Sequence, residues 1–253
     1  MFSLDFLIVI FSHPLFFFFC NFALFYETKI TMMNRLIEII AAVALVCSLT
    51  GCTKQEKTYY PDGHLQSSIE YKMGKEHGRS LYYYDRPNTL EIEMEMRKGK
   101  RNGEFKRYYE NGGLDTYCVY HNDTIVGEEV MYLPNGTKTQ IFTYKNGKRN
   151  GAHTAYHING EVKIEGGFKD DMFDGQWIYY DERGVVVGEG AFKSGRGDVI
   201  FYDQNGQKAR LTHYENNKKD GKEIYYNPDG SIAQEIIYKQ DRIISQTTDT
   251  TKE

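Results

Sequence analysis

Glycines that close a short polar turn recur at a nearly constant spacing between residues 60 and 230. Each follows a tyrosine by four residues, in segments such as YYPDG, YYENG, YLPNG and YHING. From Gly112 to Gly230 the intervals are 24, 24, 24, 22 and 24 residues, and the interval of 49 between Gly63 and Gly112 equals two units. A fixed period of this size indicates a tandem repeat whose units pack against their neighbours.

A second turn lies inside each unit, in segments such as YKMGKEHG, YKNGKRNG and YENNKKDG. Runs of about five to eight residues rich in Tyr, Phe, Ile, Val and Thr separate the turns, which is the length and composition of strands. Asn-Gly and Asp-Gly adopt positive φ at little cost, as hairpin turns require. We therefore predict an all-β fold, an elongated single-layer antiparallel meander of about eight tandem β-hairpins and about sixteen strands.

Two aromatic positions recur in every regular unit. The residue four before the turn glycine is Tyr59, Tyr108, Tyr132, Tyr156, Tyr180, Tyr202 or Tyr226. The residue eight after it is Tyr71, Tyr120, Tyr144, Phe168, Phe192, Tyr214 or Tyr238. Because aromatic cross-strand pairs stabilise a sheet, we predict continuous ladders of both rows along one face, open to a binding partner. The binding residues expected there are Tyr108, Tyr132, Tyr156, Tyr180, Tyr202, Tyr226 and Trp177.

Two units depart from the pattern. In YYYDRPNTL, Pro87 and Asn88 replace the turn glycine, and Tyr83 and Met96 fill the aromatic positions. The unit around AFKSGRGDVIFYDQNG is two residues short. We expect a tightened link near 194–197 and an unbroken array.

The first 51 residues differ from the repeats. Residues 1–26 form a nearly uncharged run long enough to span a bilayer. A second apolar stretch, IIAAVALVCSL, follows a short polar start at Met32 and Met33 and ends at LTGC, the layout of a secretory signal peptide. Translation from Met32 or Met33 would make 1–31 an upstream extension; the alternative is a transmembrane segment at 1–26.

LTGC resembles the lipobox of bacterial lipoproteins, in which the cysteine becomes the lipidated first residue. The resemblance implies a signal peptide at 32–51 and lipidation of Cys52, with anchoring at a membrane of the bacterial cell envelope. Cys20 and Cys47 lie in the removable segments, so Cys118 has no partner for an intrachain disulfide. It occupies the position of Ile69, Phe142 and Ile236 in other units, and we expect it to be buried.

The repeat Y-K-N-G-K-x-N-G-x-x-x-x-Y-Y-x-N-G is similar to the MORN-repeat variant of bacterial proteins, many of which are described as YwqK-like antitoxin components. The resemblance covers about 56–243 and implies an elongated single-layer sheet. We accordingly divide the chain into the extension 1–31, the signal peptide 32–51, a tether 52–55, the array 56–243 and a disordered polar tail 244–253.

Catalytic, cofactor and metal motifs are not evident. His153 and His157 are four residues apart in a strand, about 13 Å, too far to share one ion, so we expect them to face solvent. DDMFDG lacks the downstream ligands of a calcium loop and is interpreted as a turn. Trp177 is either a binding anchor or a packing residue. The net charge of −4, with no basic block, argues against nucleic acid.

These features predict a non-enzymatic, lipid-anchored scaffold that binds a protein or an envelope polymer, with no cofactor, metal or small-molecule substrate. An antitoxin that binds and neutralises a partner toxin is the alternative. An enzyme such as a glycan hydrolase would need array carboxylates that no motif marks.

Overall fold

The computed structural model describes residues 32–33, 35–38 and 53–248 of the chain. It contains two compact units, Met1–Cys52 and Thr53–Glu253. Residues 32–33 and 35–38 of the first unit are helical, and no helix among the described residues has the length and apolar character needed to cross a membrane. The expected lipidation site at Cys52, the apolar extension and most of the signal peptide lie outside the described residues.

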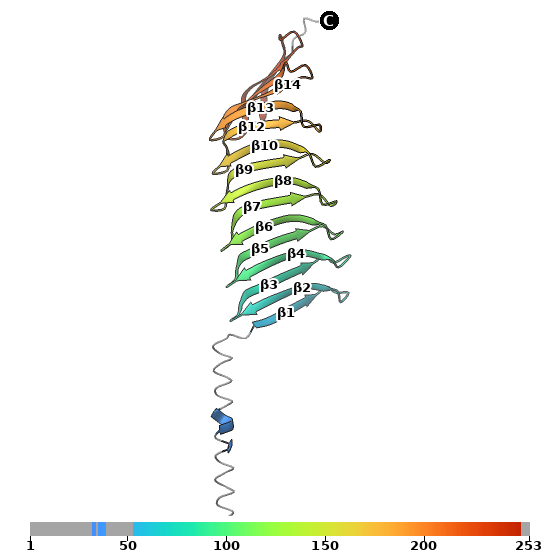
Figure 1. Cartoon of the computed structure of the whole chain (residues 1–253), viewed down its shortest axis with the longest axis vertical. Coiled ribbons are helices and arrows are strands. Elements are labelled where there is room, and N and C mark those ends of the chain that lie inside the picture. Colours follow the sequence, from blue (N-terminus) through green and yellow to red (C-terminus); the bar gives the residue numbers. More distant parts are fainter. Residues whose placement is uncertain (1–31, 34, 39–52, 249–253) are drawn as a thin grey trace, which may run out of the picture. The chain divides into compact units, whose positions relative to one another are not determined.

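The second unit is one sheet of 18 strand segments (Figure 1). The strands are β1 (Thr53–Tyr59), β2 (Leu65–Lys72), β3 (Lys75–Tyr83), β4 (Leu90–Arg97), β5 (Lys100–Tyr108), β6 (Leu114–His121), β7 (Thr124–Tyr132), β8 (Lys138–Lys145), β9 (Lys148–Tyr156), β10 (Val162–Lys169), β11 (Met172–Phe173), β12 (Gly175–Tyr180), β13 (Val186–Lys193), β14 (Arg196–Tyr202), β15 (Lys208–Glu215), β16 (Lys218–Tyr226), β17 (Ile232–Lys239) and β18 (Arg242–Thr248).

Each strand pairs antiparallel with its neighbours in sequence, as in the hairpins β8–β9 and β16–β17. The segments β11 and β12 both pair with β10 and form one strand interrupted at Asp174. The predicted antiparallel meander is confirmed. Strand β1 begins at Thr53, inside the expected tether 52–55. Strand β18 continues to Thr248, so the predicted tail 244–253 is ordered over its first five residues.

One edge of the sheet consists of eight two-residue turns in which both residues have positive φ. They are Met73-Gly74, Lys98-Gly99, Asn122-Asp123, Asn146-Gly147, Asp170-Asp171, Ser194-Gly195, Asn216-Asn217 and Gln240-Asp241. Two positive φ values define the type I′ turn, whose twist matches that of the flanking strands. We call this edge the turn edge. The segment DDMFDG contains one of these turns, as expected.

Longer loops form the opposite edge, which we call the loop edge. In the loop from Tyr60 to His64, the Gly63 N–H donates to the Tyr60 carbonyl and the Tyr60 N–H donates to the His64 carbonyl. Gly63 has a φ of 90°. This is a type I turn closed by a left-handed residue, a three-residue hairpin loop. In the degenerate unit Asn88 supplies the positive φ, at 63°, as the sequence predicted.

A two-residue bulge explains the 24-residue period. In β9 the register with β8 shifts between Tyr144↔Arg149 and Phe142↔His153, which leaves Asn150 and Gly151 extra, with Gly151 at a φ of 132°. The hairpin β13–β14 keeps one register throughout. The 22-residue unit therefore lacks the bulge. Our expectation of a tightened link was wrong, because Ser194-Gly195 is an ordinary type I′ turn; the array is nevertheless unbroken.

The two aromatic rows lie on opposite faces, which corrects our prediction of one shared face. Gly151 pairs with Phe168 of the next strand, and Gly103 pairs with Tyr120 in the same way. Tyr156 lies five residues after Gly151. Because side chains alternate between faces, an odd offset places Tyr156 on the other side. We call the side with Phe168 the aromatic face and the side with Tyr156 the tyrosine face.

The best-buried apolar residues lie on the aromatic face. Phe168, Trp177, Phe192 and Val199 form the core cluster, and Phe142, Phe173 and Tyr214 pack against it. Gly166 opposes Trp177, where an added Cβ would lie 2.3 Å from the indole ring, so the small residue makes room for the large one. A single-layer sheet thus gains a local core by pairing glycine with an aromatic residue across strands.

Candidate functional site

The tyrosine face is the candidate binding surface. Tyr108, Tyr132, Tyr156, Tyr180, Tyr202 and Tyr226, predicted as binding residues, form a row at the ends of alternate strands next to the loop edge. All six are half-buried. A row of this kind offers apolar rings and polar tips to one partner.

Glutamates fix half of this row. The hydroxyl of Tyr108 donates to Glu93 at 3.3 Å, that of Tyr180 to Glu165 at 2.8 Å, and that of Tyr202 to Glu189 at 2.6 Å. Each glutamate lies on the strand before its tyrosine. The bond to Glu165 raises the pKa of Tyr180, and that to Glu189 raises the pKa of Tyr202. These rings are therefore held in one orientation, which lowers the entropy lost when a partner binds.

Trp177 is separate from this surface. Its side chain is 4% exposed, and its ring lies 5.4 Å from Phe168 and 4.6 Å from Phe173, measured between centroids. The structure places it on the aromatic face in the core. Of the two interpretations left open by the sequence, Trp177 matches the packing residue.

His153 is buried, which corrects the prediction that it faces solvent. It is 6% exposed and stacks on Phe142 with 4.4 Å between ring centroids. Its Nδ1 lies 3.1 Å from the Ile141 carbonyl oxygen. Burial lowers the pKa of His153. Nε2 of His157 instead contacts the Tyr180 carbonyl oxygen at 2.9 Å. Among residues 53–248, no cluster of His, Cys, Asp or Glu has the arrangement of a metal site.

Cys118 occupies the core position that the repeat predicted. It is 1% exposed, and burial raises the pKa of its thiol to about 11. A thiol with so high a pKa is almost wholly protonated near neutral pH and is a poor nucleophile.

The aromatic face also carries a buried carboxylate, Glu223, that the sequence analysis missed. Glu223 is 1% exposed and accepts hydrogen bonds from Thr212 at 2.9 Å and from Lys219 at 2.7 Å. Arg210 Nε lies 4.0 Å from the same oxygen, and the guanidinium stacks over Phe201 at 4.3 Å. Burial opposes ionisation of Glu223, but Lys219 and Thr212 outweigh it and lower its pKa. A carboxylate bound by its neighbours in this way is structural.

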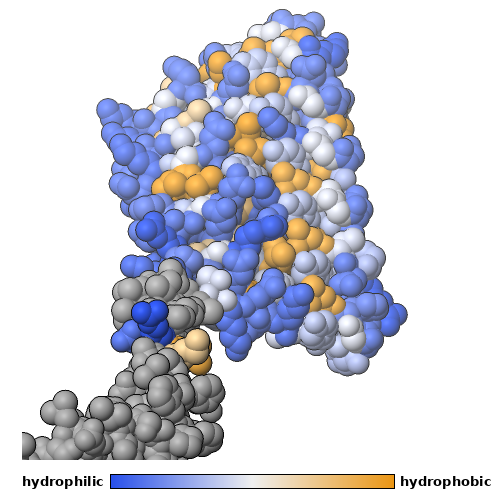
Figure 2. All heavy atoms as spheres, turned by 60° about the horizontal axis from the view of Figure 1, so that its bottom comes forward, coloured by the Kyte–Doolittle hydropathy of each residue, from blue (hydrophilic) through white to orange (hydrophobic). Residues whose placement is uncertain are grey.

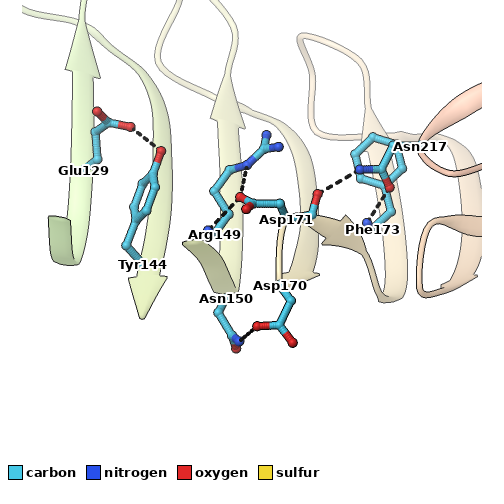
Figure 3. A network of polar contacts seen from close by, with 8 residues as sticks. All are labelled: Glu129, Tyr144, Arg149, Asn150, Asp170, Asp171, Phe173 and Asn217. Carbon is cyan, nitrogen blue, oxygen red and sulfur yellow. Dashed lines mark hydrogen bonds and ion pairs between the residues drawn. The ribbon is translucent and has the colours of Figure 1, made fainter. Parts of the chain in front are cut away.

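Side chains of one unit cap the turn edge of the previous unit. Asp171 Oδ1 accepts from the Arg149 backbone N–H at 2.9 Å, and the Asp171 N–H donates to the Arg149 carbonyl at 2.9 Å (Figure 3). Asp123 caps Arg101 and Asp241 caps Lys219 in the same way. These aspartates hold the second, left-handed position of the type I′ turn, where glycine is the usual residue. The sequence signal is an Asp in place of the turn glycine.

Asn217 replaces this cap beside the short unit. Gly195, the residue in the capping position, has no side chain to offer Phe173. Asn217, one unit further on, accepts from the Phe173 N–H at 2.7 Å and donates to the Asp171 carbonyl at 2.8 Å (Figure 3). A Cβ on Gly195 would lie 2.8 Å from the Asn217 side-chain oxygen. The missing bulge and the missing Cβ together allow this long contact.

The loop edge is tied together differently. The hydroxyls of Tyr60, Tyr84 and Tyr109 each donate to a backbone carbonyl of the next unit at 2.7 Å. The acceptors are the carbonyls of Tyr108 and Tyr132 of the tyrosine row and of Tyr83, which fills the same position in the degenerate unit. Both edges are thus linked from unit to unit, and the row between them is held on a continuous backbone.

The sheet surface is open. A hollow of about 610 Å³ lies between two loops and is lined by residues that include Asp181, Tyr202 and Asp203. Figure 2 shows one side of the sheet, where apolar residues form small groups separated by hydrophilic ones. A mixture of this kind is found on protein surfaces in general, interfaces with other proteins included.

Comparisons with known proteins relate four segments of the array to a repeat family. The family described as MORN repeat variant matches residues 53–73, 101–122, 196–216 and 219–240. No protein of curated function matches the chain. Crystal structures of TcdB2-TccC3-TEV and TcdB2-TccC3 align over 77% and 76% of this chain at 12% identity, with TM-scores of 0.22 and 0.20. The chain spans only 14% and 15% of the length of those chains. Four segments of this one continuous sheet thus match the MORN repeat variant.

Proposed function

We propose that this protein is a non-enzymatic repeat scaffold, anchored at the bacterial cell envelope by a lipid on Cys52. Its array binds a protein or an envelope polymer through the tyrosine face. The observation that carries the binding role is the row of six half-buried tyrosines, of which Tyr108, Tyr180 and Tyr202 are oriented by glutamates. A ring that a hydrogen bond already holds in place loses little further entropy when a partner binds. Aromatic residues also supply much of the binding energy at interfaces.

The anchor is supported by the position of the LTGC segment. Cys52 directly precedes Thr53, the first residue of β1. A lipidated cysteine would therefore attach the sheet to a membrane without an intervening linker. The fold supports a binding role because repeat arrays present extended surfaces of this kind.

Intact mass and fractionation test the anchor. The protein from its native membrane fraction should have the mass of residues 52–253 plus a diacylglyceryl or triacyl group. Cys52→Ala should abolish lipidation and processing. Cys47→Ala, in the apolar stretch of the signal peptide five residues before Cys52, should change neither. A protein of unprocessed mass in the soluble fraction would exclude the lipid anchor.

Photo-cross-linking tests the surface. A cross-linking residue at Tyr132 or Tyr156 should capture a partner in intact cells, and one at Tyr82 or Tyr225, which lie on the aromatic face, should capture far less. Equal capture from both faces would contradict the assignment. If the captured partner is a protein whose expression alone is toxic, the array acts as an antitoxin, the alternative function.

A further inference from the structure

The two edges of the sheet carry opposite charge. The four-residue segments of the turn edge are 72–75, 97–100, 121–124, 145–148, 169–172, 193–196, 215–218 and 239–242. They hold thirteen Lys or Arg and five acids, a net charge of +8. The loops at 60–64, 84–89, 109–113, 133–137, 157–161, 181–185, 203–207 and 227–231 hold eight acids and two Arg, a net charge of −6. The chain's small net charge of −4 conceals this separation.

Cations oppose cations across the ends of five hairpins. The cross-strand pairs are Lys72↔Lys75, Arg97↔Lys100, Lys145↔Lys148, Lys193↔Arg196 and Lys239↔Arg242. Like charges directly opposite each other destabilise a strand pair. A glutamate at either member would remove the repulsion, so folding alone does not account for this arrangement.

Most of these cations have no anionic partner in the structure. Within residues 53–248, Arg196 pairs with Glu215 at 3.2 Å and Lys239 with Asp220 at 3.1 Å, and the other eleven cations of the turn edge make no ion pair. All but Lys72 are exposed. Successive turns are two strands apart, roughly 10 Å, which is close to the screening length of about 8 Å at physiological salt. The pairs at 72–75 and 97–100 lie on adjacent turns and reinforce one another. The turns at 121–124, 169–172 and 215–218, with net charges of −1, −1 and 0, separate the remaining pairs, so the turn edge carries a row of cation clusters.

We propose that the turn edge binds a linear anionic polymer bearing phosphate or carboxylate groups, which runs along the edge from one cation cluster to the next. This surface is separate from the tyrosine face, so the proposal goes beyond the binding role given above and names the chemistry of one further partner. A hollow of about 440 Å³ lies at the cation cluster of residues 97–100, lined by Arg97, Lys98, Lys100, Asn102, His121 and Asn122. It combines three cations with amide donors, a setting suited to an anionic group.

A flexible chain fits this edge better than a flat surface does. Figure 1 shows the C-terminal hairpins turned relative to the N-terminal ones, so the edge winds along the array. A planar membrane would meet only part of a winding edge, whereas a flexible polymer follows it.

The acidic loop edge of a second copy of the protein is a poorer partner for the turn edge than its charge suggests. Asp62 accepts from the His64 N–H, Asp181 from the N–H of Val185, and Asp203 from the N–H of Gln207. These carboxylates close their own loops and are not directed outward as a row.

The test uses the full chain in a neutral detergent, with long-chain inorganic polyphosphate and polygalacturonate as probes. Affinity is measured by titration at several salt concentrations. One variant carries Lys75→Glu, Lys100→Glu, Lys148→Glu and Lys193→Glu, which turns four like-charge pairs into opposite-charge pairs. The control carries Lys57→Glu, Lys138→Glu, Lys163→Glu and Lys208→Glu, exposed residues off the turn edge, and has the same net charge.

The wild type should bind at least one probe, and the salt dependence of log K should be steep. In the turn-edge variant the slope should fall by about four in magnitude, and the affinity should fall about a hundredfold or more. The control should keep most of both. Because the turn-edge changes remove repulsions, thermal unfolding should occur at an equal or higher temperature, which separates lost binding from lost folding.

Binding of only one probe would identify the anionic group. The proposal is overturned if neither probe binds, or if the control loses as much affinity as the turn-edge variant. These outcomes do not depend on the lipid at Cys52, because the measurement is made in detergent. The anchor is tested by intact mass and the tyrosine face by cross-linking, so each can fail separately.

Discussion

The regular hairpins in the segment from β3 to β10 differ from the region around the short hairpin β13–β14 in the bulge that each hairpin contains and in the side chain that caps the turns. In the regular hairpins the two-residue bulge contains a glycine that pairs with an aromatic residue of the next strand, as Gly103 pairs with Tyr120. The short hairpin has no bulge, and a side chain from the following unit replaces the local cap. The deepest apolar core lies here, around Trp177 and Val199. An array therefore tolerates an irregular unit when neighbouring side chains restore the lost contacts.

The largest expected difference between the two regions concerns core packing. Trp177→Ala should destabilise the array by about 3–5 kcal/mol, because a large ring buried among aromatic neighbours leaves a cavity. Phe105→Ala, at the corresponding row of a regular hairpin, should cost about 1–3 kcal/mol, since Phe105 is only half-buried. Urea unfolding measures both. Equal costs would show that the core is spread evenly along the sheet.

Removal of a capping side chain should produce the second largest difference in stability between the two regions. Asn217→Gly keeps a left-handed residue but removes both bonds, to the Phe173 N–H and the Asp171 carbonyl, and should cost about 2 kcal/mol. Asp123→Gly removes two exposed bonds, from the backbone N–H and the side chain of Arg101, which water can replace, and should cost about 1 kcal/mol or less. If the two variants have equal midpoints of urea unfolding, the bonds made by Asn217 contribute no more stability than those made by Asp123.

A pH effect should arise where the two regions meet, at His153. Burial holds the folded-state pKa of His153 below its ordinary value of 6.5. The unfolded chain therefore binds the proton more readily, and stability should fall as the pH drops below about 6.5 until the folded-state pKa is reached. His153→Phe keeps a stacked ring and should weaken this dependence. Thermal unfolding at pH 7.5 and 5.5 measures it; an unchanged difference between the two pH values would assign the effect to other groups.

The smallest expected effect compares hairpin ends in the two regions. Lys148→Glu in a regular hairpin and Lys193→Glu in the short one each convert a like-charge pair into an opposite-charge pair. Each should stabilise the array by about 0.2–1 kcal/mol at low salt, with less effect at high salt. Chemical denaturation at two salt concentrations resolves the change, and a loss of stability in either variant would contradict the repulsion inferred from the pairing.

Turn chemistry made the fold predictable. Asn-Gly, Asp-Gly and their relatives encode positive φ locally, so the hairpins and their order follow from the residues near each turn, including Asn88 in place of glycine. The assignment of faces failed because a bulge is defined by its partner strand: only the pairing of Gly151 with Phe168 shows which side Tyr156 takes. Burial of His153 depends on Phe142 of the preceding strand, and the cap by Asn217 depends on a unit 44 residues away.

The bridging side chain of Asn217 also restricts how this array can change its length. Where contacts join only adjacent units, a unit of 24 residues can be duplicated or deleted, because the flanking units can then form the same contacts with each other. Between Asp171 and Asn217 this interchangeability is lost, because one side chain spans 46 residues and requires the short unit between its two ends. Insertions and deletions should therefore accumulate among the regular copies, while the segment from β11 to β16 is inherited as a block.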